Sequence, residues 1–247
     1  MAQYAHDQVV PNRTSGLEKK EQVEQMFDHI AGNYDFLNRS MSMGIDKGWR
    51  KKAILKLKAS SPQHILDVAT GTADVAIMAS RLLKPEHIKG IDISEGMLEV
   101  GRKKVRQAGL SEVIELLKGD SETINFNDNT FDAVTVAFGV RNFQHLEKGL
   151  AEIRRVLKPG GKLVVLEFSK PTSPLYKPFY QLYMKTICPL MAHLFSKSSA
   201  AYEYLDESID KFPEGKNFTR VLESVGFRNT SIQKMTFGIC SIYCGEK

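Results

Sequence analysis

The stretch Ile65-Leu66-Asp67-Val68-Ala69-Thr70-Gly71-Thr72-Ala73-Asp74 decides the fold of this 247-residue chain. An apolar run that carries one acid passes directly into small residues, which is typical of a buried strand that turns sharply into a helix. Small residues in such a turn let a ligand approach the backbone closely. This stretch therefore predicts a ligand-binding loop at the start of an α/β domain.

Strands and helices alternate after this loop. Apolar strand signals lie at 64–69, 88–93, 113–117, 131–138 and 162–168. Helical patterns lie between and after them, at 74–83, 95–108, 145–157 and 217–225. This alternation predicts parallel crossovers and a doubly wound sheet. The last two strands, 229–235 and 237–244, are joined too tightly for a crossover helix, so we expect an antiparallel hairpin at one edge of a seven-stranded sheet.

The rest of the chain is organised around this sheet as one domain. We expect an N-terminal helical section at 1–60, a ligand-binding core at 62–170, a helical lid at 171–215 and a C-terminal helix and hairpin at 216–247. Ser15 and Glu18 form a capping-box pattern, which predicts a helix running on to Tyr34. A second helix is expected from Trp49 to Leu57. The turn at 158–161, Lys-Pro-Gly-Gly, is expected to separate a helix from the strand that follows.

Composition excludes several classes of protein. The chain is 42% hydrophobic and 26% charged, so it can bury a full-sized core. Its net charge is only +5 and no long basic block occurs, which argues against nucleic acid as a partner. No apolar run approaches the ~20 residues of a membrane span. Three cysteines form neither a disulfide framework nor a metal-ligand pattern, and no apolar leader is present, so we expect a protein of the reducing cytoplasm.

The segment 171–202 differs in composition from the rest. It holds six aromatic residues, three lysines (Lys177, Lys185 and Lys197) and no acid. It suits a hydrophobic lid whose cationic rim touches anionic lipid headgroups at the inner face of the membrane. The same aromatics can equally form the core of the lid, with the lysines merely solvated. The sequence leaves peripheral membrane contact and homo-oligomerisation open.

The loop of small residues matches a dinucleotide-binding fingerprint only in part. That fingerprint has glycine at three set positions, which fall here on Ala69, Gly71 and Asp74. One glycine of three is weak support for a pyrophosphate cradle, and a tight turn without a ligand is the alternative. A nicotinamide dehydrogenase is therefore a competing interpretation that this loop disfavours.

Polar residues also follow the second and third strands. Asp92 ends the second strand, where a carboxylate suits the hydroxyls of a ribose. Asp120 and Ser121 follow the third strand and are placed to bond the edge of an adenine. Either acid could instead cap a helix. Three such signals in series, each at the carboxyl end of a strand, favour a nucleoside-containing ligand.

Several motifs resemble those of a known family. The loop at 65–74, Asp92, Asp120 and the run Arg-Val-Leu-Lys-Pro-Gly-Gly at 155–161 resemble class I S-adenosylmethionine-dependent methyltransferases, which have a Rossmann-like fold. Three stretches are similar in particular to the quinone-biosynthesis C-methyltransferases: 34–42 reaching Trp49, 138–142, and 155–169. The similarity covers about 20 to 245.

This resemblance implies an enzyme, its cofactor and its substrate. The cofactor would be S-adenosyl-L-methionine, and no metal is expected. The substrate would be demethylmenaquinol, a prenylated quinol of menaquinone biosynthesis. In some family members the substrate is instead 2-polyprenyl-6-methoxy-1,4-benzoquinol, a ubiquinone precursor. Two further alternatives are a class I methyltransferase that acts on another small molecule and a methyltransferase-like scaffold without enzymatic activity. The implied cofactor residues are Asp67, Gly71, Thr72, Asp92, Asp120 and Ser121.

Two positions depart from the family pattern. Asp46 stands where the N-terminal signature usually has histidine, and Leu37 replaces the usual methionine. The second exchange conserves volume. The first exchanges an imidazole for a carboxylate, so a mechanism that relies on a histidine there does not transfer.

Methylation of a quinol ring carbon requires a group that stabilises a phenolate. Arg141 is the main candidate because it follows the fourth strand, and a structural salt bridge is its alternative. Asn142 could orient the quinol oxygen or satisfy the turn. Tyr34 and Asp35 could close over the substrate, although a buried helix-end tyrosine is equally typical of a core. The basic cluster of Arg102, Lys103, Lys104 and Arg106 is expected to be a solvated helix face.

Overall fold

A seven-stranded sheet forms the centre of the computed structural model, which describes residues 4–171, 182 and 199–247. The strands are β1 (His64–Val68), β2 (His87–Asp92), β3 (Ile114–Lys118), β4 (Phe131–Ala137), β5 (Leu157–Phe168), β6 (Arg228–Met235) and β7 (Cys240–Glu246). Their order is β3-β2-β1-β4-β5-β7-β6. The first five are parallel, and β7 pairs antiparallel with both β5 and β6. The doubly wound sheet with a C-terminal hairpin at its edge is thus confirmed.

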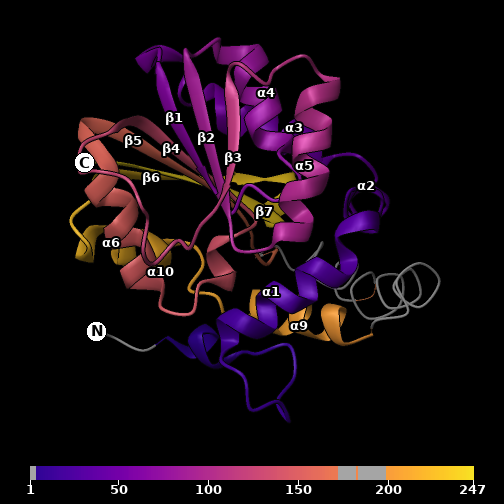
Figure 1. The fold of residues 1–247 in the computed structure, drawn as a ribbon. Coiled ribbons are helices and arrows are strands. Elements are labelled where there is room, and N and C mark those ends of the chain that lie inside the picture. Colours follow the sequence, from indigo (N-terminus) through magenta and orange to yellow (C-terminus); the bar gives the residue numbers. More distant parts are fainter. Residues whose placement is uncertain (1–3, 172–181, 183–198) are drawn as a thin grey trace.

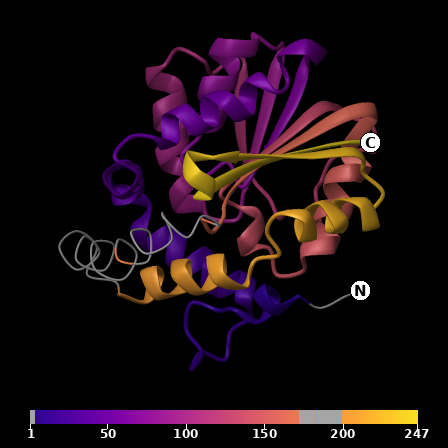
Figure 2. The ribbon, with the colours of Figure 1, turned by 180° about the vertical axis from the view of Figure 1, so that it is seen from behind.

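Helices cover both faces of this sheet (Figures 1 and 2). One face packs against α3 (Asp46–Leu55), α4 (Asp74–Leu83) and α5 (Glu95–Gln107), and the other against α6 (Leu146–Val156) and α10 (Lys216–Ser224). Apolar residues repeat at helical spacing on the inner side of each helix; in α6 these are Leu146, Leu150 and Ile153, all buried. Burial of these two faces positions the carboxyl ends of the parallel strands.

Three further helices lie around those strand ends: α1 (Lys19–Ile30), α2 (Tyr34–Ser42) and α9 (Ser199–Lys211). Figures 1 and 2 both show α9 beside α1. A small apolar cluster of Val9, Val23 and Tyr204 joins the two helices to the N-terminal arm. The N-terminal section is therefore part of the wall that faces the strand ends.

The start of the N-terminal helix was wrongly predicted. Helix α1 begins at Lys19 with Glu18 as its N-cap, and the Glu21 carboxylate accepts a hydrogen bond from the Glu18 amide. The Ser15 hydroxyl instead accepts a local bond from the Leu17 amide. A capping box of Ser15 and Glu18 was expected, but Glu18 and Glu21 offer a second, overlapping register, and this later one forms.

The boundaries of two neighbouring elements also differ from the expectation. A 3-10 turn at Ala31–Asn33 ends α1 before Tyr34, which opens α2 instead, and α3 begins at Asp46 rather than at Trp49. Strand β5 already begins at Leu157, opposite Phe131, with a register shift before Ala133. The residues 158–161 are thus an irregularity inside β5 and not a turn ahead of it.

The predicted lid lies largely outside the described residues. Only Pro171, Leu182, α9 and the residues after it are described within 171–215, so most of the aromatic and lysine pattern of 171–202 lies outside the described residues. Among the described helices, none has the length and apolar character needed to cross a bilayer.

Candidate functional site

A cavity of about 640 Å³, open to solvent, lies at the carboxyl ends of β1 to β4 beneath α1 and α2. The loops after the four strands contribute Ala69, Gly71, Asp92, Ile93, Gly119, Asp120, Ser121, Glu122, Ala137, Phe138, Gly139, Asn142, Phe143 and Gln144. Helices α1, α2 and α5 contribute Lys20, Val23, Phe27, Tyr34 and Met97.

The loop after β1 has an unusual backbone. Ala69, Gly71 and Ala73 all have φ between 53° and 65°, in the left-handed region that alanine rarely adopts. A Cβ added at Gly139 would lie 2.6 Å from the Ala69 Cβ, so the loops after β1 and β4 touch where no side chain fits. Ala69 stands at a glycine position of the dinucleotide fingerprint, and it and Ala73 adopt strained conformations that leave the backbone open to a ligand.

Asp92 links the loops after β1 and β2. Its carboxylate accepts hydrogen bonds from the backbone amides of Gly71 (2.8 Å) and Ser94 (2.9 Å), and it lines the cavity. Loss of water around this carboxylate raises its pKa to about 6, although the amide hydrogen bonds oppose that shift. The carboxylate is therefore positioned at the cavity wall and titrates close to neutral pH.

Asp67 and Thr72 lie outside the cavity lining. The Asp67 carboxylate is buried and accepts hydrogen bonds from the hydroxyls of Thr70 (2.6 Å) and Thr135 (2.5 Å). Burial raises the Asp67 pKa to about 6. Asp67 and Thr72 therefore hold the loop after β1 from outside the cavity lining, whereas Gly71 of that loop lines the cavity.

Asp120 and Ser121 line the cavity after β3, as their position in the sequence suggested. Asp120 pairs with Lys20 of α1, and its other oxygen accepts from the Glu122 amide (2.9 Å). This ion pair joins the third loop to the helix above it. Nothing in the sequence placed α1 here, because the contact spans 100 residues.

Arg141 and Asn142, adjacent in the sequence, lie in different environments. Arg141 is buried outside the cavity lining, and its guanidinium donates to Glu167 (2.8 Å) and to the Phe138 carbonyl (2.6 Å). Asn142 lines the cavity, and its side-chain oxygen accepts from the Tyr204 hydroxyl (3.0 Å). That bond leaves the Asn142 NH₂ group without a partner among the described residues, available to donate to a ligand.

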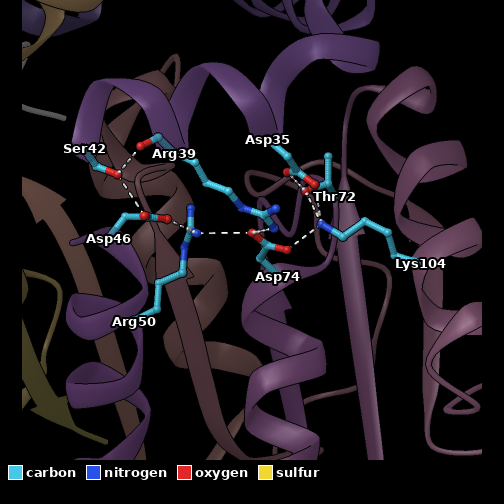
Figure 3. A network of polar contacts seen from close by, with 8 residues as sticks. All are labelled: Asp35, Arg39, Ser42, Asp46, Arg50, Thr72, Asp74 and Lys104. Carbon is cyan, nitrogen blue, oxygen red and sulfur yellow. Dashed lines mark hydrogen bonds and ion pairs between the residues drawn. The ribbon is translucent and has the colours of Figure 1, made fainter. Parts of the chain in front are cut away.

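A polar network fastens α2 over the cofactor loop (Figure 3). Asp35 accepts from the Thr72 hydroxyl (2.6 Å) and from Lys104 (2.6 Å), while Tyr34 beside it lines the cavity. Lys104 also pairs with Asp74 at the start of α4. One ammonium group thus holds α2, α4 and α5 together around the loop.

The network continues into α3 through Arg50. This guanidinium pairs with Asp74 (3.2 Å) and with Asp46 (2.5 Å), and Asp46 accepts from the Ser42 hydroxyl (2.8 Å). Asp46 is buried and outside the described cavity lining. The carboxylate that departs from the family pattern therefore balances the charge of Arg50.

Lys104 shows why the solvated-face prediction was wrong for part of the basic cluster. Lys103 and Arg106 are exposed, but Arg102 donates to the Leu116 carbonyl and pairs with Glu95. Lys104 follows the buried Gly101 by three residues, so it lies on the inward side of α5. That spacing was the signal in the sequence for an inward-facing lysine.

Replacing Lys104 by methionine is expected to loosen α2 at the cavity mouth. Asp35 and Asp74 would lose their shared cation, and we expect the free energy of unfolding to fall by about 1 kcal/mol. Backbone amides of 34–42 should exchange with deuterium faster than in the wild-type protein. Lys103→Met removes the same charge from an exposed site and should change neither quantity; equal exchange in both variants would contradict the role of the network.

The cavity suits S-adenosylmethionine on three structural grounds. Its floor is backbone from the strained loop at 69–73, a carboxylate stands at the end of β2, and Asp120 and Ser121 lie at the end of β3. Apolar side chains of Ile93 and Met97 complete the wall between these polar groups. A small apolar enclosure with a few convergent polar groups is typical of a nucleoside site. Among the described residues no cluster of His, Cys, Asp and Glu resembles a metal site.

Comparisons with known proteins agree with this geometry. A model of the ubiE/COQ5 methyltransferase family matches residues 15–247. A demethylmenaquinone methyltransferase of Bacteroides fragilis is 49% identical over 244 residues, covering 99% of both chains. A ubiquinone/menaquinone biosynthesis C-methyltransferase UbiE of Geotalea daltonii is 46% identical, covering 93% of this chain and 98% of the relative.

A solved structure shares the fold. A SAM-dependent methyltransferase from Aquifex aeolicus superposes with a TM-score of 0.56 at 20% identity, covering 78% of this chain and 88% of the other. At that identity the likeness concerns the fold alone.

Proposed function

Because this chain belongs to the ubiE/COQ5 methyltransferase family, we propose that it methylates a ring carbon of demethylmenaquinol to give menaquinol. It is an S-adenosylmethionine-dependent methyltransferase with the class I fold. The observation that carries the choice of substrate is the 49% identity, over nearly the whole of both chains, to a demethylmenaquinone methyltransferase. A nicotinamide dehydrogenase is set aside because the family is one of methyltransferases.

We propose that the cofactor is held by groups from the first three strand ends. Asp92 would accept the ribose hydroxyls, Asp120 and Ser121 would bond the adenine, and the Gly71 backbone would lie against the cofactor. Asp67 and Thr72 would act from behind by holding the loop in its strained form. When bound, S-adenosylmethionine supplies an electrophilic methyl group on a sulfonium.

The protein's task at the substrate is to stabilise a phenolate. A phenol-like hydroxyl has a pKa of about 10, and the ring carbon beside it becomes nucleophilic as the proton passes to a water or a base. After methyl transfer, the same carbon loses its hydrogen as a proton, which restores the aromatic ring. We propose that the Asn142 NH₂ group donates to this oxygen, since the Tyr204 bond fixes its orientation. Tyr34 would pack over the ring from α2, with Asp35 holding that helix in place. Arg141 would act through its positive charge and by holding the loop at 138–142.

The benzoquinol precursor of ubiquinone is the second candidate substrate. The name of the Geotalea daltonii relative, 46% identical, covers both quinone pathways. A prenylated quinol of either kind partitions into lipid, so we also propose that the enzyme works at the inner face of the membrane.

Incubation with methyl-labelled S-adenosylmethionine tests the proposed activity. Purified protein would be offered reduced demethylmenaquinone and, separately, reduced 2-polyprenyl-6-methoxy-1,4-benzoquinone. We expect label in menaquinol, at a kcat/KM well above that for the benzoquinol. Label in the benzoquinol alone would assign the second substrate, and label in neither would contradict the proposed function.

Cofactor affinity is expected to depend on pH. The ionised Asp92 is the form that accepts ribose hydroxyls, and its pKa in the free protein is about 6. Affinity should therefore be constant above pH 7 and fall below pH 6, by about tenfold for each pH unit. Calorimetric titration with S-adenosylhomocysteine at pH 5, 6 and 7.5 measures this. The Asp92→Asn variant should bind more weakly at pH 7.5 and show a much flatter profile; an equally steep profile would assign the titration to another group.

A further inference from the structure

The outer surface of α3 carries an unusual concentration of charge. Within 36–60 there are seven Lys or Arg residues and one Asp, a net charge of +6, whereas the whole chain has +5. The remaining 222 residues therefore sum to −1. Five exposed lysines on and just after α3, which we call the basic face, account for most of this charge: Lys47, Lys51, Lys52, Lys56 and Lys58.

The basic face is not neutralised by nearby acids. The single acid of this stretch, Asp46, is buried and already paired with Arg50. Among the described residues, none of the five lysines forms an ion pair with a carboxylate. Lysines elsewhere on the surface do so, as in the pairs of Lys118 with Glu24 and of Lys158 with Asp132. The inner sides of α2 and α3 hold a network of both charges (Figure 3). The exposed charged residues of 36–60 are all cations.

Exposed apolar side chains accompany these cations. Met43 is 76% exposed, Ile45 42% and Leu55 37%. Met43 ends α2 in the left-handed conformation, and Ile45 is the N-cap of α3, so both occupy the turn that leads into the basic face. Leu55 lies two helical turns after Lys47, on the same side of α3. Cations beside protruding apolar groups are typical of a surface that binds at a lipid interface.

Helix α3 lies directly behind the cavity lining. On the inner side of α3, the Trp49 ring packs against Phe138 at 6.4 Å between centroids, and Phe138 lines the cavity. Helix α2 contributes Tyr34 to the same cavity. A surface bound by the basic face would therefore lie one helix away from the cavity.

We propose that the basic face docks the protein on the anionic surface of a bilayer, with Met43 and Ile45 inserted among the headgroups. The choice of lipid rests on the exposed cations together with the protruding apolar side chains of Met43 and Ile45, because a bilayer interface accommodates both. The purpose of docking rests on the proposed function, because an enzyme that methylates a prenylated quinol must take it from the bilayer. The binding of the basic face to the bilayer does not itself require a quinol.

Flotation with quinol-free vesicles tests the proposal. Wild-type protein should float with vesicles of phosphatidylglycerol and phosphatidylcholine, less so at high salt, and not with phosphatidylcholine alone. The variant Lys47→Gln/Lys51→Gln/Lys52→Gln should bind about 100-fold more weakly. The matched control Lys103→Gln/Arg106→Gln/Lys216→Gln removes the same charge from exposed sites on other helices and should bind within threefold of wild type.

Two further variants and one assay make the outcomes separable. Met43→Gln/Ile45→Gln should weaken vesicle binding but keep its salt dependence. Methylation of a short-chain, water-soluble quinol should be unchanged in the Lys47/Lys51/Lys52 variant, so failure of docking is distinct from failure of the proposed activity. Three results would overturn the proposal. Equal loss of vesicle binding in both triple variants would show an effect of net charge alone, and no vesicle binding by the wild-type protein would show that the basic face is merely solvated. Binding to RNA but not to vesicles would assign nucleic acid as the partner.

Discussion

Replacing Glu167 by alanine is expected to lower the free energy of unfolding by about 3–5 kcal/mol. The Glu167 carboxylate pairs with Arg141 at 2.8 Å, and the two side chains are 1% and 7% exposed. Glu167 also accepts from the Phe168 amide at 2.9 Å. Its loss would leave a buried guanidinium without a counter-charge, and urea unfolding followed by circular dichroism would measure the cost. A loss below about 1 kcal/mol would contradict this assignment.

The same pair allows the structural and the proposed catalytic roles of Arg141 to be separated. Arg141→Met/Glu167→Leu replaces both charges by apolar groups of similar size and should recover most of the lost stability. If Arg141 stabilises the phenolate, this variant should fold and bind S-adenosylhomocysteine normally but turn over at least tenfold more slowly. Wild-type turnover in the double variant would reduce Arg141 to a structural salt bridge, the alternative that its sequence position left open.

The sheet could be predicted because its determinants are local. Buried parallel strands appear as short apolar runs such as 64–68, and the small residues after them mark the turn into a helix. Positions at the carboxyl ends of parallel strands converge by topology, so Asp92, Asp120 and Asn142 could be expected at one edge. All three line the cavity.

Contacts between residues far apart in the sequence could not be predicted from local patterns. Lys20 meets Asp120 across 100 residues, and no local pattern indicates which side of α1 faces the strand ends. For Arg141, the position of the residue could be predicted but the direction of its side chain could not. Position in the chain brought it to the correct loop, but only its neighbours determine that its guanidinium turns toward Glu167 and away from the cavity lining.

The predicted boundaries of helices and strands were wrong where two local signals compete. Glu18 and Glu21 offered a capping register that displaced the one expected from Ser15. At Leu157, pairing with Phe131 extends β5 backward through a stretch whose proline and glycines suggested a turn. Tertiary pairing decides such cases because the difference in local free energy is small.

Asp92→Ala is expected to weaken binding of S-adenosylmethionine by about 10- to 150-fold. Hydrogen bonds from ligand hydroxyls to a carboxylate contribute about 1.5–3 kcal/mol, and each 1.4 kcal/mol corresponds to a factor of ten in the dissociation constant. The carboxylate is already oriented by the amides of Gly71 and Ser94, so it needs little rearrangement to bind. Calorimetry at pH 7.5, where Asp92 is ionised, would measure the change.

The matched control for this variant is Asp28→Ala. Asp28 accepts from the Ser94 hydroxyl (2.6 Å) and the Gly96 amide (2.9 Å), so it braces the same loop from α1 without belonging to the cavity lining. We expect its removal to change the dissociation constant by less than about threefold, because no ligand contact is lost. Equal weakening in both variants would mean that Asp92 acts only by shaping the loop, and an unchanged constant in Asp92→Ala would remove it from the cofactor site altogether.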